Sequence, residues 1–231
     1  MAEHISSHFH QELEQVRTDV LGMGGLVEQQ LVRTLEALGG GNREVLAQIV
    51  QNDETINALS VAVDDDCQTI LVRRQPTAGD LRLVLAVSRM ITDLERMGDE
   101  IKKIAQHAAN LMVRNNVGFP QLYDTARLLE MTAPMLKAAL DAFARLDAQE
   151  ILRLNESDKL LDLAYRNQSR TLLTYMMEDP HFIGTGMELM LMNKAAERIG
   201  DHAKNIGEHI VYLVRGIDVR HMSYEEMEKG I

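Results

Sequence analysis

The feature that most constrains the fold of this chain is an internal repeat. Residues 95–99 read Glu-Arg-Met-Gly-Asp, and residues 197–201 read Glu-Arg-Ile-Gly-Asp, 102 positions later. Upstream, the Asp-Glu-Thr-Ile of residues 53–56 corresponds to residues 158–161, 105 positions later. A period of this length indicates duplication of a whole helical unit rather than a short solenoid repeat.

Hydrophobic spacing divides the chain into six helical segments. The glycines at 39–41 and the prolines at 76, 120 and 180 supply breaks between them. In the third and sixth segments, apolar residues alternate at steps of four and three, which is the spacing of a heptad seam. Pro134 falls inside the fourth segment and predicts a kink there. The expected segments are residues 8–38, 43–73, 80–113, 120–146, 148–178 and 185–216.

These segments predict an all-α fold of two tandem antiparallel three-helix bundles, related by an internal pseudo-twofold axis. The expected domains are a first three-helix repeat over residues 1–116 and a second over residues 117–216. A short polar tail, residues 217–231, should be ordered in part at best. Aromatic residues make up only 4% of the chain, so its apolar content is mostly aliphatic and methionine, which favours helices.

Charge and cysteine content narrow the classes of function. The net charge of −11 disfavours a nucleic-acid partner, because the phosphate backbone would repel it. The single cysteine, Cys67, leaves no internal disulfide, and we expect its side chain to be buried as a small apolar group. The N-terminus shows no secretory signal, and no apolar run is long enough to span a membrane. We therefore expect a soluble, cytoplasmic protein.

The repeated motif carries the candidate chemistry. With the apolar seam facing inward, Glu95, Arg96 and Asp99 face away from it. Glu95 and Asp99 are four residues apart and thus neighbours on one helix face, as are Glu197 and Asp201. Neighbouring carboxylates repel each other unless Arg96 or a bound cation neutralises them. Carboxylate oxygens favour hard cations such as Mg²⁺, Ca²⁺, Mn²⁺ or iron.

A single acidic pair is more often a solvated, salt-bridged surface, but the same register in both halves favours a site. Gly98 and Gly200 strengthen that interpretation, because glycine inside a helix costs about 1 kcal/mol relative to alanine. They predict close approach by a neighbouring helix or by a bound group. We interpret His202 and His209 as surface or interhelical residues, and the acidic run 64–66 as solvated or as lending one carboxylate to a shared site.

No catalytic motif is recognisable in the sequence. A ferritin-like di-iron centre would need Glu-x-x-His pairs within helices, and none is present. There is also no phosphate-binding loop, nucleophile elbow or His-Glu-x-x-His zinc motif. We therefore expect a protein that is not an enzyme.

The two motifs, together with several other stretches, resemble the PhoU family over nearly the entire chain. The resemblance implies a six-helix, two-bundle fold and often a homodimer. It also implies a negative regulator of the phosphate-starvation response. Such a regulator couples the phosphate ABC transporter, through its ATPase subunit, to a sensor histidine kinase, and reaches the membrane only through these partners. The other matching stretches are residues 23–30, 73–78, 80–82, 141–145 and 173–179.

Members of this family can bind metal through acid-x-x-x-acid motifs on the outer bundle face. The resemblance also implies an asparagine four residues after the second acid, which Asn205 supplies and which Lys103 replaces in the first half. Lys103 either disfavours a cation there or reaches away to solvent. The cation is a divalent ion or iron (Mg, Mn, Ca, Fe or Zn), which the resemblance does not identify. The implied ligands are Glu95, Asp99, Glu197, Asp201 and Asn205, supported by Arg96, Gly98, Arg198 and Gly200.

Three hypotheses follow from these patterns. The first is a regulatory adaptor whose helical faces bind transporter and kinase, with cations on the acidic faces tuning the contact. The second is a carboxylate metalloenzyme, which would need an open coordination position and a general base. The third is a purely structural helical module whose acids form surface salt bridges.

Overall fold

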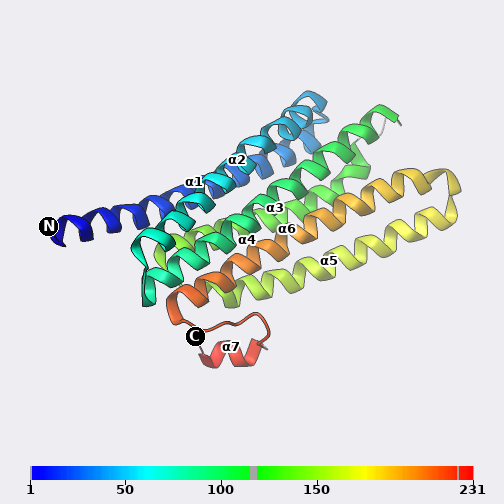
Figure 1. Cartoon of the computed structure of the whole chain (residues 1–231). Coiled ribbons are helices and arrows are strands. Elements are labelled where there is room, and N and C mark those ends of the chain that lie inside the picture. The colour runs from blue at the N-terminus through cyan, green and yellow to red at the C-terminus, as the bar shows by residue number, and fades with distance from the viewer. Residues whose placement is uncertain (1, 115–118, 223, 231) are drawn as a thin grey trace.

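The computed structural model describes residues 2–114, 119–222 and 224–230, and helices account for most of these ranges (Figure 1). All six expected helices are present, so the all-α fold is confirmed. Their ends lie within two residues of the expected ones, except that the first helix begins six residues earlier, at Ala2. The expected domain boundary between residues 116 and 117 lies outside the described residues. The elements are α1 Ala2–Gly40, α2 Arg43–Arg74, α3 Ala78–Arg114, α4 Phe119–Arg145, α5 Glu150–Glu178, the 3₁₀ turn η1 Pro180–Phe182, α6 Ile183–Arg215 and α7 Tyr224–Gly230.

Local chemistry explains where these helices begin and end. Helix α1 continues through the first two glycines of the break and ends before Gly41, whose positive φ of 62° suits glycine. Asn42 then caps α2, because its side-chain oxygen accepts a hydrogen bond from the Val45 backbone N–H at 3.2 Å. Gly216 ends α6 in the left-handed conformation, with φ of 72°. Pro134 lies inside α4, which continues as one helix on both sides of it.

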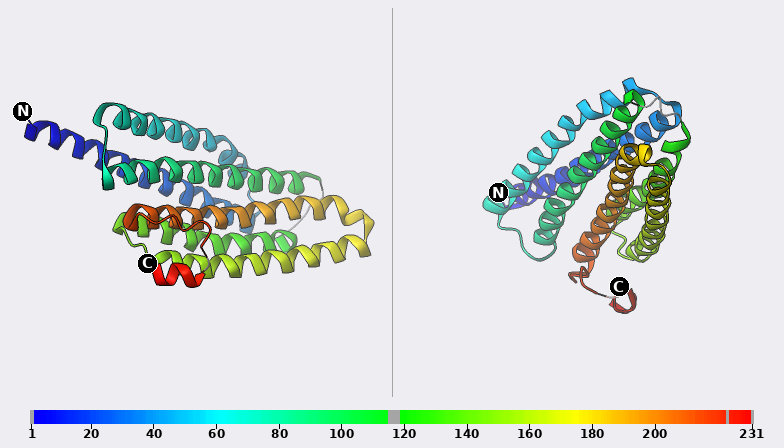
Figure 2. Two further views of the ribbon diagram at one scale, coloured as in Figure 1. Left: turned by 60° about the horizontal axis from the view of Figure 1, so that its bottom comes forward. Right: turned by 90° about the vertical axis from the view of Figure 1, so that its right-hand side faces the viewer.

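The six long helices form two antiparallel bundles, α1–α3 and α4–α6 (Figure 2). Helices α3 and α6, one from each bundle, lie side by side where the bundles meet, and they make the most extensive helix–helix contact of the described structure. Helix α1 also packs on α4, so the two halves share one continuous apolar core. The third helix of each half is therefore covered by the helices of its own bundle and also by the other bundle.

The heptad seam of each third helix lies in this core, as its spacing predicts. The seam side chains are excluded from water, which supplies the main favourable term of folding. Cys67 is buried too, at 1% exposure, as expected from the sequence. Fully buried seam residues are Met90, Leu94, Met97, Ile101 and Ile104 in α3, and Met192, Ile199, Ala203 and Ile206 in α6.

The C-terminal tail differs from the expectation of a polar, partly ordered segment. Val219 and Met227 are buried, and α7 packs against α5. The Asn155 side-chain amide donates a hydrogen bond to the Met227 sulfur at 3.3 Å. Two buried apolar side chains thus anchor a segment whose composition is otherwise polar.

None of the helices in the described ranges combines the length and the apolar character that a membrane span requires.

Candidate functional site

Three carboxylates of the first half gather along the contact between α2 and α3. Glu95 and Asp99 come from α3, and both Asp99 and Asp53 of α2 act electrostatically on Glu95. Asp53 is completely buried, and its Oδ2 accepts hydrogen bonds from Lys102 Nζ at 2.8 Å and from the Asn57 amide at 3.3 Å. Its other oxygen, Oδ1, is buried and has no hydrogen-bond partner. A buried carboxylate oxygen without a partner is costly, so it marks a place where a positive group would be stabilising.

The second half repeats this arrangement between α5 and α6. Asp158 of α5 accepts a hydrogen bond from Lys204 Nζ at 2.6 Å, as Asp53 does from Lys102. Glu197 and Asp158 both act on Asp201, which places all three carboxylates in one cluster. Lys194 adds a second ammonium group here, with its Nζ 2.5 Å from Glu197 Oε2. We call these groups the first cluster (Asp53, Glu95, Asp99, Lys102) and the second cluster (Asp158, Glu197, Asp201, Lys204).

Both clusters carry more negative charge than their surroundings compensate. Burial raises the pKa of Glu95 above its usual range, and the charges of Asp99 and Asp53 raise it further, while Arg96 opposes them. Burial likewise raises the pKa of Asp201, followed by the charges of Glu197 and Asp158. Raised carboxyl pKa values mean that the ionised forms are disfavoured as the side chains stand, and a bound cation would reverse this.

The acidic pairs are less exposed than the sequence analysis expects. Glu95, Asp99 and Asp201 are half-buried, and Glu197 is only 8% exposed. They therefore face the neighbouring helix of their own bundle rather than open solvent.

The motif glycines explain how that neighbouring helix comes so close. A Cβ added to Gly98 would lie 3.2 Å from Asp53 Oδ1 and 3.3 Å from Ile56 Cδ1. A Cβ on Gly200 would overlap the side chain of Leu161 on α5. Of the two explanations left open by the sequence, the structure shows the neighbouring helix at both positions, and in the first half that helix brings a carboxylate with it.

The carboxylates lie near each other without forming a finished coordination shell. Within the described ranges, no three His, Cys, Asp or Glu side chains are already arranged to hold a metal ion. The oxygen-only donor set, the partnerless oxygen of Asp53 and the raised pKa values nevertheless fit a hard cation. Metal ligation by the repeated acids stays a prediction.

Two further motif residues make contacts other than the expected ones. The Asn205 amide donates to Asp93 Oδ1 at 3.1 Å, so it binds a residue of the opposite half. Arg198 likewise reaches across to α3, where its guanidinium lies 2.9 Å from the Glu100 carboxylate. Lys103 also pairs with Glu100, at 3.0 Å, which takes its ammonium away from the first cluster. Exposed Arg96 acts electrostatically on Glu95 of the same motif and lowers its pKa.

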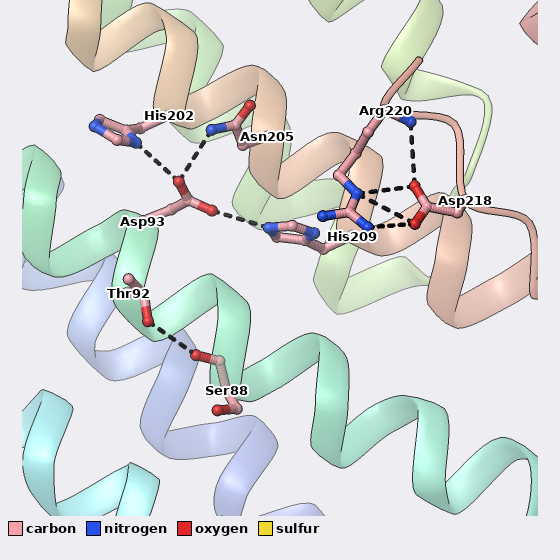
Figure 3. A network of polar contacts seen from close by, with 8 residues as sticks. All are labelled: Ser88, Thr92, Asp93, His202, Asn205, His209, Asp218 and Arg220. Carbon is pink, nitrogen blue, oxygen red and sulfur yellow. Dashed lines mark hydrogen bonds and ion pairs between the residues drawn. The ribbon is translucent and has the colours of Figure 1, made fainter. Parts of the chain in front are cut away.

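Asp93 organises the polar part of the contact between α3 and α6 (Figure 3). Its Oδ1 lies 2.8 Å from His202 Nδ1, and its Oδ2 lies 2.9 Å from His209 Nε2. A carboxylate only accepts hydrogen bonds, so both imidazole nitrogens donate. Burial raises the pKa of Asp93, but the hydrogen bonds from His202, His209 and Asn205 outweigh it and lower the pKa to about 2. The two histidines are thus interhelical, one of the two positions expected for them.

In the acidic run of α2, residues 64–66, Asp64 makes its contacts outside both clusters. Asp64 accepts hydrogen bonds from Ser88 Oγ of α3 at 3.0 Å and from the Gln68 amide at 2.8 Å. Neither partner belongs to a cluster, so the contacts of this run do not support a carboxylate shared with the repeated motif.

Sequence reasoning missed Asp53 and Asp158 as members of the clusters and Asp93 as the centre of the interhelical network. The first two carried a usable signal, because they occupy matching positions in the two halves, as do Lys102 and Lys204. Asp93 carried none, since its partners lie more than 100 residues away in the sequence.

Comparison with known proteins shows similarity along both halves. The PhoU domain family matches residues 20–108 and 125–210. A curated relative from Pseudomonas putida, named phosphate-specific transport system accessory protein PhoU homolog, is 43% identical over 98% of this chain and 88% of its own length. The accessory protein PhoU of Escherichia coli is 40% identical over 98% of this chain and 93% of its own length.

Solved structures agree with this assignment. The crystal structure of PhoU from Pseudomonas aeruginosa matches with a TM-score of 0.83 and 41% identity, covering 90% of this chain and all of that one. The regulatory protein PhoU from Streptococcus pneumoniae matches with the same TM-score at 28% identity, covering 91% of this chain and 99% of that one. With a duplicated three-helix unit, a repeated acidic motif in each third helix and similarity along its whole length, the chain belongs to the PhoU family.

Proposed function

We propose that this protein is an accessory regulator of phosphate uptake that holds the phosphate-starvation response silent while phosphate is plentiful. The observation that carries the proposal is its full-length similarity to phosphate-specific transport system accessory proteins. The fold supports it, because two bundles that pack together through α3 and α6 present long outer helix faces. Such faces are suited to binding other proteins rather than to enclosing a substrate.

In this proposal the protein acts by contact and not by catalysis. Its partners are the phosphate ABC transporter, through the ATPase subunit, and the sensor histidine kinase, and it acts as a homodimer in the cytoplasm. The net charge of −11 favours basic partner surfaces and disfavours direct binding to anionic lipid or nucleic acid.

The two clusters are proposed to bind divalent cations or iron. Asp53, Glu95 and Asp99 would hold the cation in the first cluster, with Asp158, Glu197 and Asp201 doing so in the second. The cation would supply positive charge to carboxylates that are poorly neutralised as they stand. The Asp53 Oδ1 atom, which has no hydrogen-bond partner, is the specific observation that favours cation binding over a plain salt-bridged surface.

A deletion strain tests the regulatory role. A phosphate-starvation promoter fused to a reporter should be active in high phosphate when the gene is deleted, and silent again when the wild-type gene is restored. A promoter that stays silent in the deletion strain would refute the proposed regulation.

Thermal unfolding tests the cation sites independently of any partner. Ligands that bind only the folded state raise its melting temperature, so Mg²⁺, Mn²⁺ or Fe²⁺ should raise it for the wild type. The increase should be lost in a Glu95→Gln, Asp99→Asn, Glu197→Gln and Asp201→Asn variant, and retained in the control Asp65→Asn. An unchanged wild-type melting temperature would favour the structural module, and hydrolysis of a phosphate ester that is lost in Asp201→Ala would favour a metalloenzyme.

A further inference from the structure

Each cluster contains one lysine that reaches across to the second helix of its half, and these two lysines make the same contact. Lys102 of α3 reaches Asp53 of α2 at 2.8 Å, and Lys204 of α6 reaches Asp158 of α5 at 2.6 Å. Both lysines lie three residues after the second acid of the repeated motif, and both aspartates occupy matching positions in the second helix of each half. An ion pair between helices that recurs in both halves is a built feature of the repeat.

These ammonium groups stand where positive charge is needed. Lys102 acts on Asp53 and Asp99, and Lys204 acts on Asp158 and Asp201. Each cluster holds three carboxylates, so the lysine neutralises only part of the negative charge, even in the second cluster, where Lys194 also pairs with Glu197. A divalent cation would neutralise more of it and would accept several carboxylate oxygens at once.

The lysine and a cation cannot both use the same aspartate fully. Lysine Nζ already occupies Oδ2 of Asp53 and of Asp158, and an ammonium next to a divalent cation would be strongly repelled. The side chains of Lys102 and Lys204 are 32% and 24% exposed, so each has a path to solvent along its flexible stem.

We propose that Lys102 and Lys204 are internal counter-ions that hold Asp53 and Asp158 in the cation-free protein and release them when a divalent cation binds. The inference rests on the proposed cation binding, and it adds that the two lysines control the affinity of the clusters for the cation. The lysines keep buried Asp53 and half-buried Asp158 paired without metal, and they set a threshold of cation concentration that a purely acidic cluster would not have.

Mn²⁺ binding to the full-length protein tests this proposal, measured by the electron paramagnetic resonance signal of the free ion. Lys102→Met with Lys204→Met should bind Mn²⁺ about tenfold more tightly per site than the wild type, because the competing ion pair is gone. Lys103→Met is the matched control, since its neighbouring ammonium pairs with Glu100 outside the cluster, and its affinity should equal that of the wild type.

A second double variant tests the proposal if the methionine variant does not fold. Lys102→Arg with Lys204→Arg keeps the charge and binds carboxylates through two N–H groups, so it should weaken Mn²⁺ binding. In the wild type, Mn²⁺ should also raise the rate at which an amine-acetylating reagent modifies Lys102 and Lys204, measured by mass spectrometry against Lys103.

The outcomes separate this inference from the proposed function. Equal Mn²⁺ affinity in the wild type and in all lysine variants would overturn the counter-ion role while leaving cation binding intact. No Mn²⁺ binding in any of the proteins would overturn both. Acetylation of Lys102 and Lys204 that does not respond to Mn²⁺ would also contradict release of the lysines.

Discussion

Replacing Asp93 with asparagine should weaken the contact between the two halves by a calculable amount. The hydrogen bonds from His202, His209 and Asn205 lower the pKa of Asp93 from 3.8 to about 2. One pKa unit corresponds to about 1.4 kcal/mol, so the ionised carboxylate contributes about 2 kcal/mol to the free energy of unfolding. Asp93→Asn removes that charge at almost constant volume and should cost about this much at pH 7.

The same shift predicts a pH dependence with a definite sign. A carboxyl whose pKa is lower in the folded state stabilises the protein above its unfolded pKa and loses that effect as the pH falls through the folded value. For Asp93 the window runs from about 3.8 down to about 2. From the Asp93 carboxyl alone, the difference between wild type and Asp93→Asn should therefore fall to about half of its pH 5 value by pH 3.

Urea unfolding followed by circular dichroism at pH 7, 5 and 3 measures these differences. The exposed Asp65→Asn serves as the control for a change of one charge and should stay within about 0.5 kcal/mol of the wild type at each pH. The carbon-13 shift of the Asp93 carboxyl gives an independent midpoint. A loss below 0.5 kcal/mol at pH 7, or a carboxyl that titrates near 4, would refute the role assigned to Asp93.

Three further predictions concern single residues. Asp201→Asn should raise the free energy of unfolding in EDTA at pH 7, because burial and nearby acids raise the pKa of this carboxyl and so disfavour its ionised form; a loss in urea melts would contradict this. Gly200→Ala should lower it by about 1 kcal/mol through overlap with Leu161, whereas Gly25→Ala, with open space around it, should not. Burial, followed by nearby acids, raises the pKa of Cys67 to about 12, so its thiol should react with a disulfide reagent at pH 8 only after unfolding in urea.

The parts of this fold that depend on local pattern could be predicted from the sequence. Helix ends follow from glycine and proline breaks, and the buried seams of α3 and α6 follow from heptad spacing. The duplication predicts that the three helices of each half pack together, because two copies of one unit are expected to pack in the same way. The acidic pairs were found for the same reason, since Glu95 and Asp99 share their spacing with the second motif.

Contacts between residues far apart in the chain could not be predicted in this way. Outward orientation was inferred from one helix alone, whereas the motif glycines let α2 and α5 cover part of that face. The resemblance predicts Asn205 as a ligand for its own motif, but it gives no sign that the Asn205 amide donates to Asp93 of the other half. Periodicity places a side chain on a helix face, but it does not say which other helix that face meets.

At the interface between α3 and α6, the two copies of the repeated unit carry different residues at matching positions. Asp93 corresponds to Ala195 in the repeat, and Glu100 corresponds to His202. Two second halves joined through this face would carry Ala195 in place of Asp93 and would lack the acid that binds His202 and His209. Two first halves would carry Glu100 and His107 at those two positions, so Asp93 would meet one imidazole and one acid. The mixed pair alone gives Asp93 two imidazoles, so separately expressed halves should assemble with each other in preference to themselves, and a gene keeping one copy would lose its docking partner.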